Sequence, residues 1–265
     1  MSRLALPLLL TVVALMASAC VAGSTDERPS VPPEPAGGAA RVLVFSRTVG
    51  FRHPSIPAGV AAIRRLGEEH GFAVDATEDV GRIRDGALAR YRALVFLSTT
   101  GDFLDGAGQD ALRRFVERGG GWVGVHAASD GEFGWPWYGE LVGAWFARHP
   151  EVQPATIHVA DRDHPATAAL PANWKRTDEW YDFRTNPRGK VHVLATVDES
   201  TYRGGGMGAD HPIAWCHTVV GGRAFYTALG HTTESFSEPL FLDHLLGAIR
   251  WTAGLAPGDC PNGPG

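Results

Sequence analysis

The chain has 265 residues, of which 44% are hydrophobic, and a formal net charge of −5 at pH 7. This composition is sufficient for one large folded domain with a full core, and it excludes a chain that is disordered throughout. Because a negative protein is repelled by a phosphate backbone, we expect no nucleic-acid partner.

The N-terminus carries the pattern of an export signal. An apolar run, LALPLLLTVVALM at residues 4–16, precedes the small residues of an Ala-x-Ala string at 17–19. The run is shorter than the roughly 20 residues of a transmembrane helix, so we interpret residues 1–19 as a cleaved signal peptide. The segment resembles a bacterial lipoprotein signal with Cys20 as the lipidated residue. This predicts an exported cell-surface lipoprotein on a lipid anchor, and simple cleavage without lipidation would give a secreted protein.

The next segment, residues 20–40, is rich in proline, glycine and small polar residues. Such a composition buries too little apolar surface to offset the entropy of ordering the backbone, which predicts a disordered tether. The folded domain is expected over residues 41–254, followed by a C-terminal tail at 255–265.

Strands and helices are expected to alternate in the first half of the domain. Short apolar runs rich in branched residues predict strands at 41–47, 72–77, 93–98 and 122–125. Apolar residues at helical spacing predict a helix from Pro57 to Gly71 and a second helix leading to Gly119. This alternation is typical of a parallel sheet covered on both faces, with functional loops at the carboxyl ends of the strands.

The pattern changes after Pro150 to short β runs separated by turns. We expect these runs near residues 156–159, 191–197, 213–219 and 223–227, with a hairpin turn at Gly221-Gly222 and a final helix at about 238–252. The whole is an α/β protein with a mostly parallel sheet and β-hairpin additions in its C-terminal half.

Two histidines follow predicted strands and are the first candidates for chemistry. His126 ends the strand in the string GGGWVGVHAASD, and His53 follows the first strand in a Gly-Phe-Arg-His loop. Since the carboxyl ends of parallel strands meet at one edge of a sheet, we expect both imidazoles in one cavity. A solvated loop histidine is the alternative for either residue taken alone.

Carboxylates beside aromatic rings form a second candidate set. Asp178, Glu179, Trp180 and Tyr181 follow one another in the string TDEWYDF, which suggests a platform for a sugar, although a core aromatic cluster with a surface acid pair fits equally. We choose His126 and His53 as catalytic residues, and the family resemblance given below implies Glu179 as the third. The expected substrate-binding residues are His231, His149, Asp178, Trp180 and Tyr181, and the other histidines are expected to be structural or exposed.

A metal ion is an alternative to metal-free acid–base chemistry. His53, His126, Glu179 and His231 would be suitable ligands for zinc or another divalent metal, with room for water. No HExxH or paired CxxC string demands such a site. Without a metal, a histidine would serve as general acid or base, which its ordinary pKa of about 6.5 suits.

Several strings together resemble the trehalose-utilisation (ThuA-like) family of the class I glutamine amidotransferase-like superfamily, over residues 41–254. They are RTVGFRHPSI, GGGWVGVHAAS, WFARHP, TDEWYDF and HPIAWCHTVVGGRAFYTALGHT. The resemblance implies a three-layer, flavodoxin-like α/β sandwich. Glutamine amidotransferases carry a cysteine nucleophile where this chain has His126, so glutamine hydrolysis is not expected.

The three cysteines predict one disulfide if the first of them takes the lipid. Cys216 and Cys260 then remain as a pair in an oxidising compartment, and two unrelated thiols are the alternative. Cysteines at these places also resemble exported members of the family. The bond would contribute about 3 to 4 kcal/mol by restricting the unfolded chain.

These observations favour an exported carbohydrate-active protein that acts on a disaccharide or keto-sugar by histidine and carboxylate chemistry, as a hydrolase or lyase. A surface-tethered protein that binds a saccharide without turning it over is one alternative. A metal-dependent hydrolase is another, and a structural domain with a vestigial site is a third.

Overall fold

The computed structural model describes Met1 and residues 39–261. The expected signal peptide, the proposed lipidation site Cys20 and most of the tether therefore lie outside the described residues. Within the described part, none of the helices combines the length and apolar character that crossing a bilayer requires.

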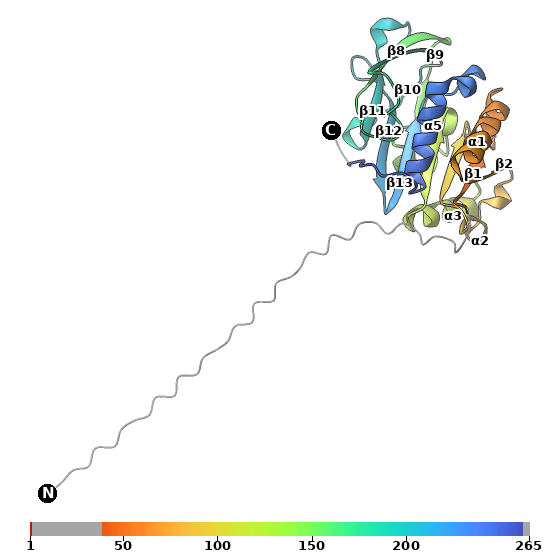
Figure 1. The fold of residues 1–265 in the computed structure, drawn as a ribbon, viewed down its shortest axis with the longest axis vertical. Helices are drawn as coiled ribbons and strands as arrows, with labels where there is room; N and C mark the ends of the chain where they lie inside the picture. The colour runs from red at the N-terminus through yellow and green to blue at the C-terminus, as the bar shows by residue number, and fades with distance from the viewer. Residues whose placement is uncertain (2–38, 262–265) are drawn as a thin grey trace.

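The described residues build a nine-stranded sheet with a parallel and an antiparallel half (Figure 1). The parallel half consists of β1 (Arg41–Phe45), β2 (Ala73–Thr77), β3 (Ala93–Leu97), β5 (Gly121–Val125) and β13 (Gly222–Thr227). The antiparallel half adds β12 (Pro212–Val219), β11 (His192–Val197), β8 (Gln153–Val159) and β9 (Asn173–Asp178). The strand order is β2-β1-β3-β5-β13-β12-β11-β8-β9.

The helices cover both faces of this sheet. They are α1 (Ile56–His70), α2 (Asp85–Leu88), α3 (Gly106–Glu117), α4 (Pro136–Val142) and α5 (Pro239–Thr252). Trp122 of β5 packs on Tyr138 of α4, whereas its neighbour Gly121 lies against Thr252 of α5. Successive residues of a strand face opposite sides, so α4 and α5 belong to different layers. Figure 1 shows α1 beside α5.

Short elements complete the structure. Two small sheets pair β4 (Thr100–Gly101) with β6 (Asp130–Gly131), and β7 (Phe146–Arg148) with β10 (Asp182–Phe183). Single-turn 3-10 helices are η1 (Val80–Arg82), η2 (His126–Ser129), η3 (Pro187–Gly189), η4 (Glu199–Thr201) and η5 (Glu234–Ser237).

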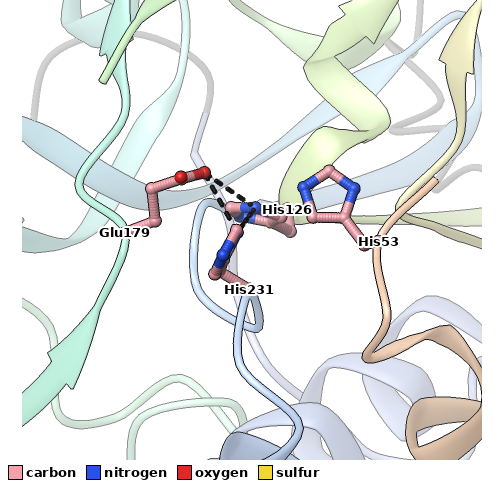
Figure 2. Close-up of side chains that lie close together, drawn as sticks. All are labelled: His53, His126, Glu179 and His231. Atoms are coloured by element: carbon pink, nitrogen blue, oxygen red, sulfur yellow. Dashed lines mark hydrogen bonds and ion pairs between the residues drawn. The ribbon is translucent and has the colours of Figure 1, made fainter. Parts of the chain in front are cut away.

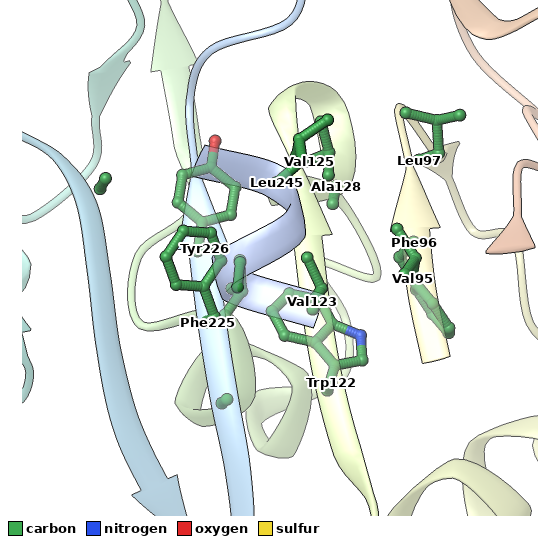
Figure 3. Packing of buried hydrophobic residues seen from close by; sticks show 14 of the residues in the cluster. Val95, Phe96, Leu97, Trp122, Val123, Val125, Ala128, Phe225, Tyr226 and Leu245 are labelled. Atoms are coloured by element: carbon green, nitrogen blue, oxygen red, sulfur yellow. The ribbon is translucent and has the colours of Figure 1, made fainter. Parts of the chain in front are cut away.

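The predicted fold class is confirmed. The order β2-β1-β3-β5-β13 is that of a flavodoxin-like sheet, and the four antiparallel strands extend it as the expected hairpin additions. Ligands bind such sheets outside the carboxyl ends of the strands. Figure 3 shows the core between these layers, where buried side chains of β3, β5 and β13 gather near Leu245 of α5.

The predicted helices form where their sequence patterns indicate. In α1, Pro57 lies in the first turn, Ile63 and Leu66 are buried, and Gly71 ends the helix with a φ of 78°. In α3, the carboxylate of Asp105 accepts a hydrogen bond from the backbone N–H of Gly108.

Strand β9 and helix α4 are absent from the sequence-based expectations, and both have a physical reason. The inward positions of β9 hold Trp174, Arg176 and Asp178, so polar residues conceal its period-two pattern. Two of these polar residues contact each other inside the protein, since Arg176 Nη2 lies 3.2 Å from an oxygen of Asp178. Helix α4 has only 7 residues, and two aromatic residues with little helical signal follow its first residue, Pro136.

The predicted disulfide between Cys216 and Cys260 is confirmed. Cys216 is fully buried in β12, so the bond fixes the C-terminal tail to the antiparallel half of the sheet. The bond closes a loop with a sequence separation of 44 residues. A loop of this size corresponds to about 4 kcal/mol in the chain-entropy model.

Candidate functional site

Four side chains from distant segments converge at the carboxyl edge of the sheet (Figure 2). His53 follows β1, His126 follows β5, Glu179 follows β9 and His231 follows β13. One ligand atom from each lies within 4.8 Å of the others. The structure thus brings together the three residues chosen as catalytic and His231, one of the two histidines expected to bind substrate.

His126 sits in a strained backbone position that the surrounding structure stabilises. Its φ is 53°, in the left-handed region that residues other than glycine rarely adopt. Its Nδ1 lies 2.7 Å from the carbonyl oxygen of Ala228, and its own carbonyl accepts a hydrogen bond of 2.8 Å from Tyr226. The sharp turn presents the fully buried imidazole above the end of β5, as nucleophile elbows do.

Three atoms of this cluster form a compact triangle. His126 Nε2 lies 3.1 Å from His231 Nδ1 and 3.4 Å from an Oε2 atom of Glu179, and His231 Nδ1 lies 3.1 Å from the same oxygen. When the ring of His126 is neutral, its Nδ1–H is donated to Ala228 and a lone pair remains at Nε2. Nδ1 of His231 carries at most one hydrogen, so it cannot donate a full hydrogen bond to His126 Nε2 and to Glu179 Oε2 at the same time.

Glu179 is held as a carboxylate on both oxygens. Oε2 faces His126 and His231, and Oε1 lies 3.0 Å from Nδ1 of His149. Burial alone would raise the pKa of this carboxyl, but hydrogen bonds and charge from His126 and His231 outweigh it and lower the pKa. Glu179 is therefore unsuited to act as a general acid.

His53 is neutral at physiological pH. Burial first, and then the nearby His126 and His231, lower its pKa to about 3. Its Nδ1 is buried and has no hydrogen-bond partner among the described residues. Its ring centroid lies 4.7 Å from that of His126 and 5.2 Å from that of His231, at nearly right angles to both.

His231 responds differently to its surroundings. Burial opposes its charged form, but the hydrogen bond and negative charge of Glu179 prevail and raise its pKa.

Asp178 and Trp180, which we expected to bind substrate, occupy other positions. Asp178 is fully buried, and its carboxylate accepts hydrogen bonds from the backbone N–H groups of Gly230 and His231 at 2.9 and 3.1 Å. It therefore positions the His231 loop beside Glu179. Trp180 is also fully buried and donates its indole N–H to the carbonyl of Gln153, so its ring faces the core.

A cavity of about 210 Å³ opens onto the cluster. Tyr181 lines it and lies against His126, with ring centroids 4.3 Å apart, and the exposed His149 stands at its rim. The lining residues are Phe51, His53, Asp130, Phe146, His149, Glu179, Tyr181 and His231.

Asp130 and Phe51 line this cavity but were not among the residues chosen from the sequence. Asp130 is half-buried, burial raises the pKa of its carboxyl, and no described residue forms an ion pair or hydrogen bond with its side chain. Both residues lie inside strings already singled out: Asp130 ends GGGWVGVHAASD, and Phe51 precedes His53 by two positions. An acid directly after the elbow turn is the signal that could have identified Asp130.

A second cluster of potential ligands contains Asp182, Glu199 and His211. His211 is fully buried, and each ring nitrogen faces an oxygen at 2.8 Å: Nδ1 faces Glu199, and Nε2 faces the carbonyl of Tyr181. Asp182 accepts a hydrogen bond from the backbone of Gly206. These atoms are already committed to hydrogen bonds within the protein, which identifies a structural network.

The first cluster fits a divalent metal by distance and by chemistry. Ligand atoms around a tetrahedral zinc ion, at bonds of about 2.0 to 2.1 Å, lie about 3.3 to 3.4 Å from one another. The triangle of His126, His231 and Glu179 has edges of 3.1, 3.1 and 3.4 Å. The hydrogen bond from His126 Nδ1 to a backbone carbonyl is the usual second contact of a metal-binding histidine. His53 supplies a further neutral nitrogen.

Solved structures with this fold include two ThuA-like proteins. One, from Bacteroides uniformis, has 26% sequence identity and a TM-score of 0.70, covering 84% of this chain and 95% of its own. Another, from Parabacteroides merdae, has 21% identity and a TM-score of 0.68, covering 81% of this chain and 90% of its own. A β-galactosidase from Bacillus circulans shares the fold alone, at 16% identity, with 82% of this chain and 32% of that chain covered and a TM-score of 0.54.

A comparison with curated proteins gave no match. The model of the ThuA family, described as trehalose utilisation, matches residues 41–252. This span contains every residue of the cavity and every strand of the central sheet. The chain therefore belongs to the ThuA family.

Proposed function

We propose that this protein is a metal-dependent enzyme that acts on a sugar, with His126, Glu179 and His231 holding a divalent ion and His53 beside them. The observation that carries the proposal is the triangle of two ring nitrogens and one carboxylate oxygen with edges of 3.1 to 3.4 Å. Two histidines and one glutamate with space for a further ligand are a known set for catalytic zinc.

A bound metal in this place would polarise a carbonyl oxygen or activate a water molecule. The side chains around it have distinct tasks. Glu179 serves as a ligand because both of its oxygens are engaged and its pKa is lowered. Asp130 is the remaining carboxyl of the cavity, and burial raises its pKa toward the range in which a group can both take and return a proton.

The proposed substrate is a disaccharide that carries a keto group. The family description, trehalose utilisation, supports a disaccharide. A keto oxygen is a suitable ligand for a divalent ion, and it acidifies the hydrogen on the neighbouring carbon. Asp130 would take that proton; the electron pair left on carbon forms a double bond as the glycosidic C–O bond breaks, and Asp130 returns the proton to the departing oxygen.

The experiment has two parts. Elemental analysis of purified protein is expected to find about one equivalent of zinc or a similar metal. Incubation with trehalose and its mono-keto derivatives, followed by NMR, is expected to release a monosaccharide from a keto derivative. Protein that binds no divalent metal after dialysis against excess zinc would refute the metal site.

A saccharide-binding protein without turnover remains the second candidate, and the Asp130→Asn variant separates it from the enzyme. If the protein is an enzyme, the variant keeps its metal and loses turnover by about 100-fold or more, as expected for loss of an acid–base group. If it only binds sugar, neither form releases product and their affinities are similar.

We also propose that the protein is exported and anchored through Cys20. The disulfide between Cys216 and Cys260 supports this, because such bonds persist in oxidising compartments. Mass spectrometry of protein from the native host is expected to find a lipid-modified N-terminal cysteine, which Cys20→Ser would abolish.

A further inference from the structure

The cavity above the cluster is small compared with its proposed ligand. Its volume is about 210 Å³, below the roughly 300 to 1,000 Å³ of pockets that enclose drug-sized molecules. It therefore has room for one sugar ring. Any second ring of a substrate must lie outside, against the residues at the mouth.

An exposed aromatic side chain lies at this mouth. Phe51 is 62% exposed although it lines the cavity, and its ring centroid is 4.9 Å from that of His53. A phenylalanine in this position exposes apolar surface to water, and covering that surface with a ligand would contribute about 25 cal/mol per Å². Its neighbour Val49 is exposed as well, at 57%.

The loop that carries Phe51 is held firmly on both sides. The carbonyl of Phe51 accepts a hydrogen bond of 2.9 Å from the hydroxyl of Thr100, and the N–H of Val49 donates to the carbonyl of Thr100 at 2.9 Å. Arg52 forms two hydrogen bonds with Glu78, at 2.7 and 3.0 Å. The backbone that carries the ring is fixed before a ligand arrives, which lowers the entropic cost of binding.

We propose that Phe51 forms a second subsite, which binds a flat apolar ring face attached to the sugar in the cavity. The ring face is either the C–H face of a second pyranose or an aromatic aglycone. This inference rests on the proposed function, since it needs a sugar ring in the cavity, and it assigns to Phe51 the platform role that the buried Trp180 cannot fulfil.

The test compares three ligands on zinc-treated protein by calorimetry: methyl α-glucoside with one ring, trehalose with two sugar rings, and 4-nitrophenyl α-glucoside with an aromatic ring. Phe51→Ala is expected to weaken binding of the ligands with a second ring by about fivefold, the range of a stacking contact. Binding of methyl α-glucoside should stay within twofold. Phe51→Trp should restore the affinity, because it supplies a larger ring face.

The matched control is Val220→Ala. Val220 is 67% exposed and lies in the hairpin at the opposite end of β13, so its removal should change none of the affinities. Equal weakening of all three ligands by Phe51→Ala, or no weakening, overturns the subsite and leaves the proposed function standing. If the parent protein binds none of the three, the subsite is overturned, whereas the sugar assignment is decided separately by release of a monosaccharide from a mono-keto derivative of trehalose. A preference for the nitrophenyl compound over trehalose would assign the subsite to aromatic aglycones.

Discussion

Two clusters of histidine and carboxylate in this molecule contain the same kinds of atoms and differ in how those atoms are used. At the carboxyl edge of the sheet, a ring nitrogen of His126, a ring nitrogen of His231 and a carboxylate oxygen of Glu179 face one another across 3.1 to 3.4 Å. In the second cluster, both nitrogens of His211 are 2.8 Å from oxygens of Glu199 and the Tyr181 backbone. Each nitrogen of His211 thus has an oxygen as its partner, whereas His126 Nε2 and His231 Nδ1 face each other as well as Glu179.

Proximity of residues that can bind a metal is therefore not sufficient to identify a metal site. What distinguishes the first cluster is that hydrogen bonds with the backbone orient its histidines, so that two ring nitrogens and one carboxylate oxygen lie 3.1 to 3.4 Å from one another. Ala228 fixes His126 through Nδ1, and Asp178 fixes the His231 loop through its backbone. The second cluster uses its inward atoms to hold the chain around Tyr181, which in turn lies against His126.

The sharpest test of this comparison is removal of one histidine from each cluster. His126→Ala should weaken zinc binding by about 1,000-fold or more, because it deletes a ligand atom of the triangle. His211→Ala should leave zinc affinity within a few-fold. Competition with a fluorescent chelator measures both. Equal losses in the two variants would contradict the distinction between the clusters.

Zinc should also stabilise the folded protein. A ligand that binds only the native state at 1,000 times its dissociation constant contributes about 4 kcal/mol. We expect the thermal midpoint of the metal-free protein to rise on addition of zinc and to fall again with a chelator. The rise should be absent in His126→Ala and present in His211→Ala, and differential scanning calorimetry would show it.

The parallel half of the fold could be predicted from the sequence because its pattern of apolar residues is simple. Strands such as β3, with burial at every position, produce continuous apolar runs that alternate with amphipathic helices. The positions of His53 and His126 at the ends of β1 and β5 then follow from the rule for parallel sheets.

The position of Glu179 at the end of a strand could not be predicted in the same way. It follows β9, whose inward positions include Arg176 and Asp178, and charged residues at such positions conceal a strand. Similarly, Trp180 and Phe51 are both aromatic residues near candidate site residues, and only the structure shows that one is buried and the other exposed. Whether such a side chain is buried depends on contacts with segments distant in the sequence, and the local sequence does not reveal these contacts.

The second cluster should matter for stability. His211→Ala removes a fully buried ring and leaves Glu199 and the Tyr181 carbonyl without their partner. We expect a loss of about 2 to 3 kcal/mol in the free energy of unfolding, measured by urea titration of the metal-free protein. A change below about 0.5 kcal/mol would show that the network contributes little to stability.

The smallest effect is expected at Asp130, and it has the opposite sign. Burial raises the pKa of this carboxyl above 3.8, so the folded chain holds the proton more tightly than the unfolded chain does. The resulting stabilisation is present below pH 3.8 and is lost as the pH rises through the raised pKa. At neutral pH the half-buried carboxylate therefore costs stability, as functional groups often do.

Asp130→Asn should raise the thermal midpoint of the metal-free protein by about 1 to 3 °C at pH 7, and the gain should vanish near pH 4. Asp102→Asn, at an exposed position directly after β4, is the matched control and should show no such gain. A lower midpoint for Asp130→Asn at pH 7 would mean that the carboxylate stabilises the cavity rather than being kept there for proton transfer.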